Sequence, residues 1–258
     1  MTLLLSREDV QIHHASWSEL AAALPRREDG TACDALIVDA PYSERTHAGH
    51  DAGIASKTWT RPSGGVDRAP KRRTLSYASW SPDDVAAFVV YWAPLTRGWL
   101  VTITDDVLAP AWADALRAAG RYVFAPLPFV APGSRVRLTG DGPSNWTCWL
   151  VVARPSRPPY SRWGTLQGAY VLPPGCSEDM PVVGGKPLWL MERLVEDYSR
   201  PGDVVCDPCC GAGTAVLAAS RTGRIGIGGD VSREHAELAA KRCGGMRQAP
   251  LFVAGVGT

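Results

Sequence analysis

Two short motifs, each directly after an expected apolar strand, constrain this chain more than any other feature. Residues 35–39 are predicted to form a buried strand, and Asp39-Ala40-Pro41-Tyr42 stands at its end. A second strand is predicted at residues 204–206, and the octapeptide from Asp207 to Thr214 follows it and opens a helix. Ligands in open α/β sheets gather at the carboxyl ends of the strands. The two motifs therefore predict one crevice built from distant parts of the sequence.

The rest of the chain alternates apolar strands with amphipathic helices, which is typical of an α/β fold with a mostly parallel sheet. Further strands are predicted at residues 10–13, 98–104, 122–130, 148–153 and 224–228. Helices are predicted at residues 18–24, 82–91, 109–119, 187–198, from 214 onward and at 232–242, with Ser81 as N-cap of the second one. With 258 residues, 45% of them hydrophobic, the chain is expected to form a single domain over residues 1–258.

Composition excludes several classes of protein. No apolar run approaches the roughly 20 residues of a membrane-spanning helix, and no basic segment precedes the apolar start, so neither a membrane anchor nor a secretory signal is expected. Seven cysteines without framework spacing indicate reduced thiols in the cytoplasm, with nucleoid association or phage encoding left open. The net charge of +1 says nothing about partners, so any nucleic-acid contact must be local.

No metal site is expected. Cys206 and Cys209 have C-x-x-C spacing, but no second cysteine pair or histidine pair follows at zinc-finger spacing. His47, His50 and Asp51 stand close together in a polar loop without a further ligand at fixed spacing. We interpret that loop as part of a lid over the substrate rather than a metal centre.

The octapeptide has features of a nucleotide-binding turn. Gly211 and Gly213 allow a tight turn and close approach of a ligand to the backbone, and the following helix presents its amino end. Asp230 lies sixteen residues after Thr214, at the end of the next strand, where Rossmann-like folds hold ribose hydroxyls. A lone G-x-G would favour a simple turn with Asp230 as a helix cap, but the whole octapeptide favours a cofactor site.

The octapeptide resembles the cofactor motif of amino-DNA methyltransferases, usually Asp-Pro-Phe-x-Gly-Ser-Gly-Thr. The segment Gly185-Lys186-Pro187-Leu188 and the later Pro201-Gly202-Asp203 are similar to the Lys-Pro helix and the Gly-Asp lead-in of that family. The tetrapeptide at Asp39 resembles its Asp-Pro-Pro-Tyr motif. Because this motif precedes the cofactor motif, the arrangement resembles the β class. The resemblance implies a circularly permuted, Rossmann-like S-adenosylmethionine-dependent methyltransferase fold, with a mostly parallel sheet and helices on both faces.

The same resemblance implies transfer of a methyl group from S-adenosylmethionine, which becomes S-adenosylhomocysteine, to adenine N6 in double-stranded DNA, without a metal. The exocyclic amine is a poor nucleophile, and a hydrogen bond to Asp39 would make its lone pair more available. The Pro41 region could supply a second acceptor, and Tyr42 a face for a base swung out of the helix. Positioning would then dominate catalysis. The implied cofactor-binding residues are Lys186, Pro187, Asp207, Pro208, Cys209, Gly211, Gly213, Thr214 and Asp230.

Departures from the family pattern leave alternatives open. Ala40 replaces the first proline of the motif, although a residue before Pro41 still favours extended backbone. Relatives that act on cytosine usually carry Ser where this chain has Asp39, which favours adenine. The alternatives are a cytosine-N4 or RNA base methyltransferase, and a binding module that keeps the cofactor pocket without catalysis. A nicotinamide-dependent oxidoreductase is a weaker one, because the third glycine is missing.

Two groups of basic residues are predicted to contact nucleic acid from both sides of the substrate region. The first comprises Lys57, Arg61, Arg68, Lys71, Arg72 and Arg73, and the second Arg135, Arg137, Arg154, Arg157 and Arg162. Residues 43–80 are expected to form a substrate or lid loop. Residues 155–183, rich in Pro, Gly and Arg, are expected to form a short target-recognition segment. A homodimer and a restriction partner are left open.

Overall fold

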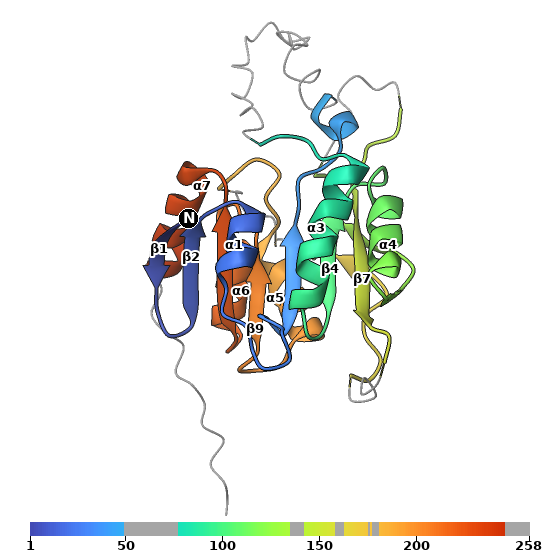
Figure 1. The fold of residues 1–258 in the computed structure, drawn as a ribbon. Helices are drawn as coiled ribbons and strands as arrows, with labels where there is room; N and C mark the ends of the chain where they lie inside the picture. The colour runs from blue at the N-terminus through green and yellow to red at the C-terminus, as the bar shows by residue number, and fades with distance from the viewer. Residues whose placement is uncertain (49–76, 135–141, 158–162, 175, 177–180, 246–258) are drawn as a thin grey trace, which may run out of the picture.

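The computed structural model describes residues 1–48, 77–134, 142–157, 163–174, 176 and 181–245, and they form a layered α/β structure (Figure 1). A ten-stranded sheet has the order β1-β2-β10-β9-β3-β4-β7-β6-β8, with β5 beside β7. The strands are β1 (Thr2–Ser6), β2 (Val10–His14), β3 (Ala35–Asp39), β4 (Leu100–Thr104), β5 (Arg121–Val123), β6 (Leu127–Val130), β7 (Thr147–Pro155), β8 (Tyr170–Val171), β9 (Val204–Asp207) and β10 (Ile225–Asp230). The helices are α1 (Trp17–Ala23), α3 (Pro82–Leu95), α4 (Ala109–Ala118), α5 (Leu188–Tyr198), α6 (Thr214–Arg221) and α7 (Arg233–Gly244).

The middle of the sheet is parallel, as the sequence predicts. Strands β2, β10, β9, β3 and β4 pair in parallel, while β1 and β7 join them antiparallel. From β9 the chain passes through α6 to β10 on one side, and from β3 through α3 to β4 on the other. The strand order therefore reverses between β9 and β3, whose registers join Ala35 to Val205 and Leu36 to Cys206. Such a switch point opens a crevice at the carboxyl ends of the strands.

Helices cover both faces of the sheet, which confirms the expected layers (Figure 1). Helices α1, α3 and α4 bury Leu20, Phe88 and Trp112 against one face, which includes Leu36. Helices α5 and α6 pack on the other face together with Ile37, and α6 and α7 cover β2. Leu36 and Ile37 of β3 thus pack into the cores on opposite faces of the sheet, because side chains alternate along a strand. This explains why β3 is an uninterrupted apolar run ending in a carboxylate.

Several predicted strand and helix boundaries differ from those of the structure. The single strand predicted at residues 122–130 is two strands, β5 and β6, and Pro126, which lies between them, cannot donate to a ladder. Strands β1 and β8 escaped prediction and lie at the two edges of the sheet. Helix α3 continues one turn past residue 91 to Leu95, with Pro94 in its last turn. Its start is confirmed, because the Ser81 hydroxyl accepts from the Asp84 amide in a capping box.

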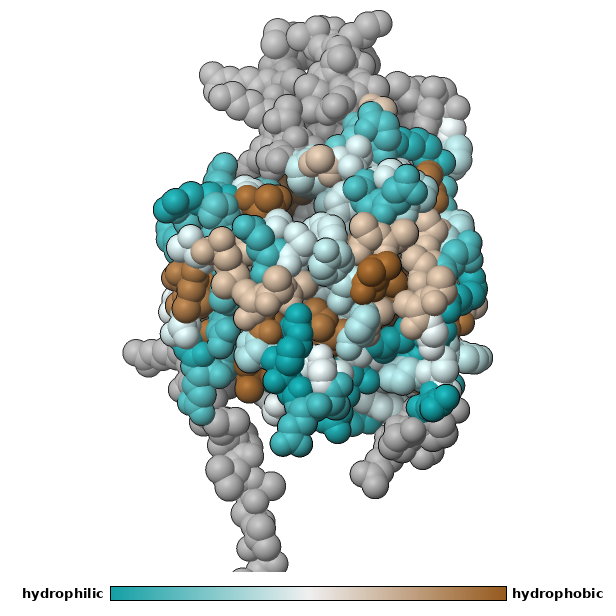
Figure 2. All heavy atoms as spheres, viewed as in Figure 1, coloured by the Kyte–Doolittle hydropathy of each residue, from teal (hydrophilic) through white to brown (hydrophobic). Residues whose placement is uncertain are grey.

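The surface over α1, α3 and α4 mixes polar and apolar side chains (Figure 2). Val90 and Tyr91 of α3 are 69% and 51% exposed there. A homodimer stays a prediction. No helix within the described ranges is long and apolar enough to cross a membrane. The described residues also contain no group of three potential metal ligands, while His50 and Asp51 lie outside them.

Candidate functional site

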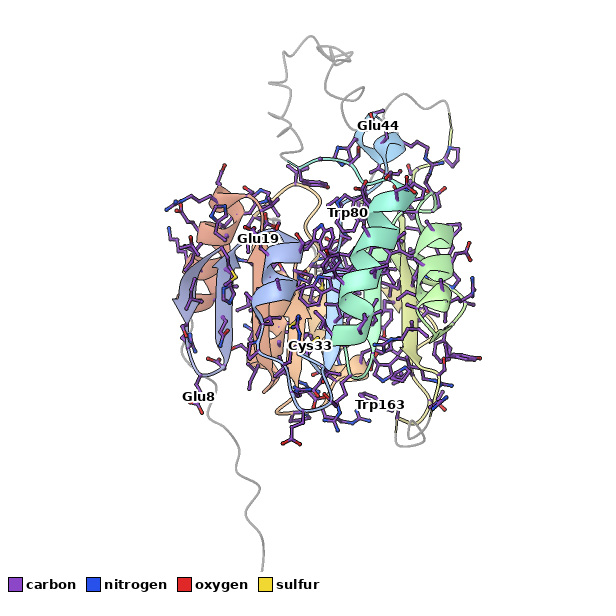
Figure 3. The ribbon with its side chains drawn as sticks, viewed as in Figure 1. Glu8, Glu19, Cys33, Glu44, Trp80 and Trp163 are labelled. Carbon is purple, nitrogen blue, oxygen red and sulfur yellow. The ribbon has the colours of Figure 1, made fainter. Side chains whose placement is uncertain are left out.

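A cavity of about 590 Å³ opens at the carboxyl ends of the parallel strands. Its wall is formed by the ends of β3, β9 and β10, by the beginning of α1 and by the segment that precedes α5. In Figure 3, Glu44 and Trp80 lie at this end of the molecule, and Glu8 and Trp163 at the opposite end. The cavity thus stands at the switch point, and it joins the two motifs that the sequence analysis singled out.

Asp39 meets Lys186 on the β3 side of the cavity. The Lys186 ammonium donates to both carboxylate oxygens of Asp39 at 2.9 Å and to the Gly184 carbonyl at 2.7 Å. Its nitrogen also lies 4.9 Å from the centre of the Tyr42 ring. The side chains of Lys186 and Asp39 are only 5% and 18% exposed. The resemblance assigned Lys186 to the cofactor, but its contacts in this structure are with the Asp39 motif.

Two further carboxylates line the other side, at the ends of β9 and β10. Asp230 accepts from the Gly211 amide at 2.9 Å and the Ser232 amide at 2.8 Å, and it lies 3.7 Å from His235. That contact with Asp230 raises the pKa of His235. Asp207 is 2% exposed, and burial, together with repulsion from Asp39 and Asp230, raises its pKa well above the usual range. This side of the cavity therefore gathers two carboxyl groups, and its surroundings oppose the ionisation of Asp207.

The two glycines of the octapeptide serve different purposes. Gly211 has φ +51° and turns the loop so that its amide reaches Asp230, next to the cavity. Gly213, with φ +75°, is the N-cap of α6, and a Cβ atom there would lie 2.9 Å from the Cβ of Ala239 in α7. Gly213 therefore permits close packing of α6 on α7. It lies outside the cavity wall, as does Pro187, which precedes α5 as its N-cap.

The structure brings the other expected residues to the cavity wall. These are Asp39, Pro41, Tyr42, Lys186, Asp207, Pro208, Cys209, Gly211, Thr214 and Asp230. The sequence analysis missed the aromatic part of the wall, made by Trp17, Tyr77 and Trp80. Trp17 begins α1, three residues after the last residue of β2, so a search just beyond the strand ends could have found it.

Asp105 was also missed, although it directly follows β4. Its carboxylate accepts from the amide and hydroxyl of Ser43, the hydroxyl of Thr46 and the amide of Leu108, at 2.5–3.0 Å. Burial alone would raise the pKa of Asp105, but the hydrogen bonds from Ser43, Thr46 and Leu108 outweigh it, so the pKa is lowered. The carboxylate thus ties the segment after Tyr42 to the start of α4.

Of the predicted basic residues, the structure describes Arg154 and Arg157. The first group lies outside the described residues, as do Arg135, Arg137 and Arg162. Arg154 is described, and it packs over the Tyr122 ring at 4.4 Å. Because β7 runs antiparallel to β4, its residue Ala153 pairs with Leu100 at the start of β4, away from the cavity. The expectation that Arg154 and Arg157 flank the substrate region is therefore wrong.

The described parts of the expected lid and recognition segments lie in different places. Residues 43–48 and 77–80 adjoin the cavity, which contains Thr46 and Tyr77 in its wall. The recognition segment begins at the far end, where Trp163 packs on Trp99 and under Arg200. Of the described residues of this segment, Val182 and Val183 reach the cavity wall. A recognition role for this segment stays a prediction.

Comparison with known proteins points to one family. Residues 183–241 match the DNA methylase family model for N6 and N4 amino methyltransferases. The chain is also 40% identical over 57 residues to the type II methyltransferases M2.DpnII of Streptococcus pneumoniae and M.HpaI of Haemophilus parainfluenzae. These alignments cover 22% of this chain, and 21% and 18% of the two relatives, so the chain spans about a fifth of their length.

The fold comparison extends over nearly the whole chain. The crystal structure of M1.HpyAVI in complex with SAM is similar with a TM-score of 0.63 and 21% identity, covering 90% of this chain and 98% of the other. The cytosine-N4-specific PvuII DNA methyltransferase gives a TM-score of 0.64 with 11% identity, covering 93% and 88%. The resemblance to the amino-DNA methyltransferases is confirmed. The chain has their Rossmann-like fold, and its tetrapeptide motif stands before its octapeptide motif in the sequence.

Proposed function

We propose that this protein transfers a methyl group from S-adenosylmethionine to the N6 amine of adenine in DNA, with the base turned out of the duplex into the cavity. The main support is that Asp39 at the end of β3 and the carboxylates at the ends of β9 and β10 line one cavity. One wall offers a hydrogen-bond acceptor for an amine, and the other offers negative charge to a cation. Methyl transfer from a cationic donor to an amine needs these two groups side by side.

The acidic wall fits the charge of this cofactor. Among the described residues, no basic side chain pairs with Asp207, and its raised pKa reflects the cost of burying an uncompensated carboxylate. A sulfonium or ammonium group nearby would reverse that cost. A dinucleotide would instead bring its anionic pyrophosphate beside Asp207 and Asp230, which weighs against a nicotinamide cofactor.

Residues of the octapeptide would hold the cofactor along its length. Gly211 lets the backbone turn at the amino end of α6, and Asp230 has lone pairs left for ribose hydroxyls after it accepts two amide hydrogens. The matched family segment contains both residues, and one similar structure was solved with SAM. When bound, S-adenosylmethionine supplies an activated methyl group on sulfur. The residues of this chain have only to orient it and exclude water.

The opposite wall would hold the base. Asp39 accepts a hydrogen from the exocyclic amine and draws its lone pair away from conjugation with the ring, and the carbonyl of Pro41, which lines the cavity, would be a second acceptor. Tyr42, 4% exposed, offers an aromatic face in the wall. An extruded base binds such a site by stacking and by hydrogen bonds to its edge. Asp39 favours adenine, and the cytosine-N4 specificity of the PvuII enzyme makes cytosine the second candidate.

The test is transfer of labelled methyl from S-adenosylmethionine to unmodified genomic DNA, followed by digestion to nucleosides. N6-methyladenine is expected with the wild type, and the Asp39→Ala variant should lose about 10²- to 10⁴-fold in rate. Labelled N4-methylcytosine, or label only in RNA, would replace the adenine assignment by that substrate. Cofactor binding without transfer to any nucleic acid would establish an inactive binding module instead.

A further inference from the structure

Lys186 has a complete set of hydrogen-bond partners within the cavity wall. An ammonium group has three hydrogens, and here they go to the two Asp39 oxygens and the Gly184 carbonyl. The nitrogen also lies over the Tyr42 ring, the surface that the proposed function assigns to the base. The Lys186 ammonium therefore lies where the target amine is expected. It is bound to the same Asp39 oxygens that this amine would use.

A base can bind here without a net loss of hydrogen bonds, because its amine and ring nitrogen can replace one hydrogen bond between Lys186 and Asp39. If the target amine donates to one Asp39 oxygen, it can take the place of the Lys186 hydrogen that points to that oxygen. The ring nitrogen next to the amine is an unprotonated acceptor, N1 in adenine and N3 in cytosine. Lys186 can transfer its freed hydrogen bond to that nitrogen and keep its bonds to the other Asp39 oxygen and to Gly184. Every buried polar group then remains satisfied, as burial requires.

We propose that Lys186 donates a hydrogen bond to the ring nitrogen beside the target amine, so that Asp39 and Lys186 together recognise one edge of the base. This rests on the proposed function and names the part of the substrate that the site recognises. The two side chains form an acceptor and a donor 2.9 Å apart, held rigid by burial. An amine with an adjacent bare ring nitrogen presents the complementary donor and acceptor.

Asp39 and Lys186 together disfavour the binding of guanine and thymine. Guanine and thymine present a carbonyl oxygen where the amine should be, and a ring N–H where the bare nitrogen should be. The oxygen would face the Asp39 carboxylate and the N–H would face the Lys186 ammonium. A site whose buried groups are left unpaired by the wrong ligand discriminates strongly against it. Lys186 is thus a specificity residue for the amino bases, beyond its neutralisation of Asp39.

The experiment uses a duplex with one methylatable adenine, identified by the transfer assay above, and a matched duplex with 1-deazaadenine, which has C–H in place of N1. Wild-type protein should lose about tenfold or more in kcat/KM on the analogue, the effect of one charged hydrogen bond. Lys186→Met should lose a similar factor on adenine and show no preference between the two duplexes. For a cytosine target, 3-deazacytosine takes the place of the analogue.

Lys241→Met is the matched control, because Lys241 is an exposed lysine on α7 and should keep the wild-type preference. A wild type that methylates both duplexes at equal kcat/KM overturns the inference, and this result does not depend on any variant folding. It is also overturned if Lys186→Met retains the preference for adenine, since the lysine then acts only on Asp39. A wild type that labels no base overturns the proposed function, and this role with it.

Discussion

Both walls of the cavity contain aspartate residues, but only on one wall is the aspartate paired with a lysine among the described residues. On the β3 side, Asp39 is matched by the buried Lys186, so this wall is nearly neutral overall. On the β9 and β10 side, Asp207 and Asp230 lie together, and among the described residues His235 lies 3.7 Å from Asp230, which raises the pKa of His235. We therefore propose that a neutral base binds against the matched pair and a cation against the unmatched carboxylates. A parallel sheet brings both walls together because its strand order reverses between β9 and β3.

The roles of the two walls can be tested separately by a substitution that disturbs the position of one wall. Asp105 fixes the segment after Tyr42 through its bonds to Ser43 and Thr46, so it acts on the β3 wall only. Asp105→Asn places an amide group, which carries two hydrogens of its own, where four donors converge. The segment after Tyr42 should therefore shift, and a shift of about 1 Å costs roughly 10²-fold in rate. We expect kcat for transfer to fall by about that factor, while the Kd of S-adenosylmethionine stays within about twofold of the wild type.

Asp106→Asn is the control for this variant. Asp106 is the next residue, half exposed, and pairs with Arg45 at the surface, so its loss should leave kcat almost unchanged. If Asp105→Asn weakens cofactor binding as much as it slows transfer, the two walls are not independent.

A smaller effect distinguishes Gly213, at the start of α6, from Gly223, after its end. Gly213→Ala should destabilise the fold by roughly 2–4 kcal/mol, because it adds left-handed strain and a clash with Ala239. Gly223→Ala has the same strain at φ +77° with no atom within 4 Å, so about 1 kcal/mol is expected. Denaturant unfolding measures both. Unchanged cofactor affinity of folded Gly213→Ala supports a packing role, and a large loss of affinity would return Gly213 to the cofactor site.

The sequence predicted the convergence of the two motifs because each depends on local information. An apolar run that ends in Asp39 or Asp207 marks a strand and its carboxyl end together, and parallel strands bring such ends to the same edge. The N-cap at Ser81 was predictable for the same reason, since its capping box spans only four residues. These features needed no knowledge of distant contacts.

What escaped prediction depends on the direction of strands and on long-range pairs. Arg154 was expected near the substrate, but β7 runs antiparallel, and no local pattern in residues 147–155 reveals that direction. Lys186 and Asp39 are 147 positions apart, so their ion pair appears only when β3 and the segment before α5 meet. Asp105 could have been found by the strand-end rule, although its partners Ser43 and Thr46 could not.

The most direct test of the central claim is the pH dependence of S-adenosylmethionine binding, measured by calorimetry in buffers of different ionisation enthalpy. Because the pKa of Asp207 is raised in the free protein, a bound cation favours its ionised form and binding releases a proton. Affinity should therefore rise with pH, by up to about tenfold per unit, and level off above that pKa. Asp207→Asn should bind at least roughly 30-fold more weakly and lose the proton release. Asp39→Ala should lose much less affinity, and its affinity should level off at a lower pH, because Asp39 contributes to the raised pKa of Asp207. Binding without proton release in the wild type, or an equal loss of affinity in Asp39→Ala, would contradict the assignment of the two walls.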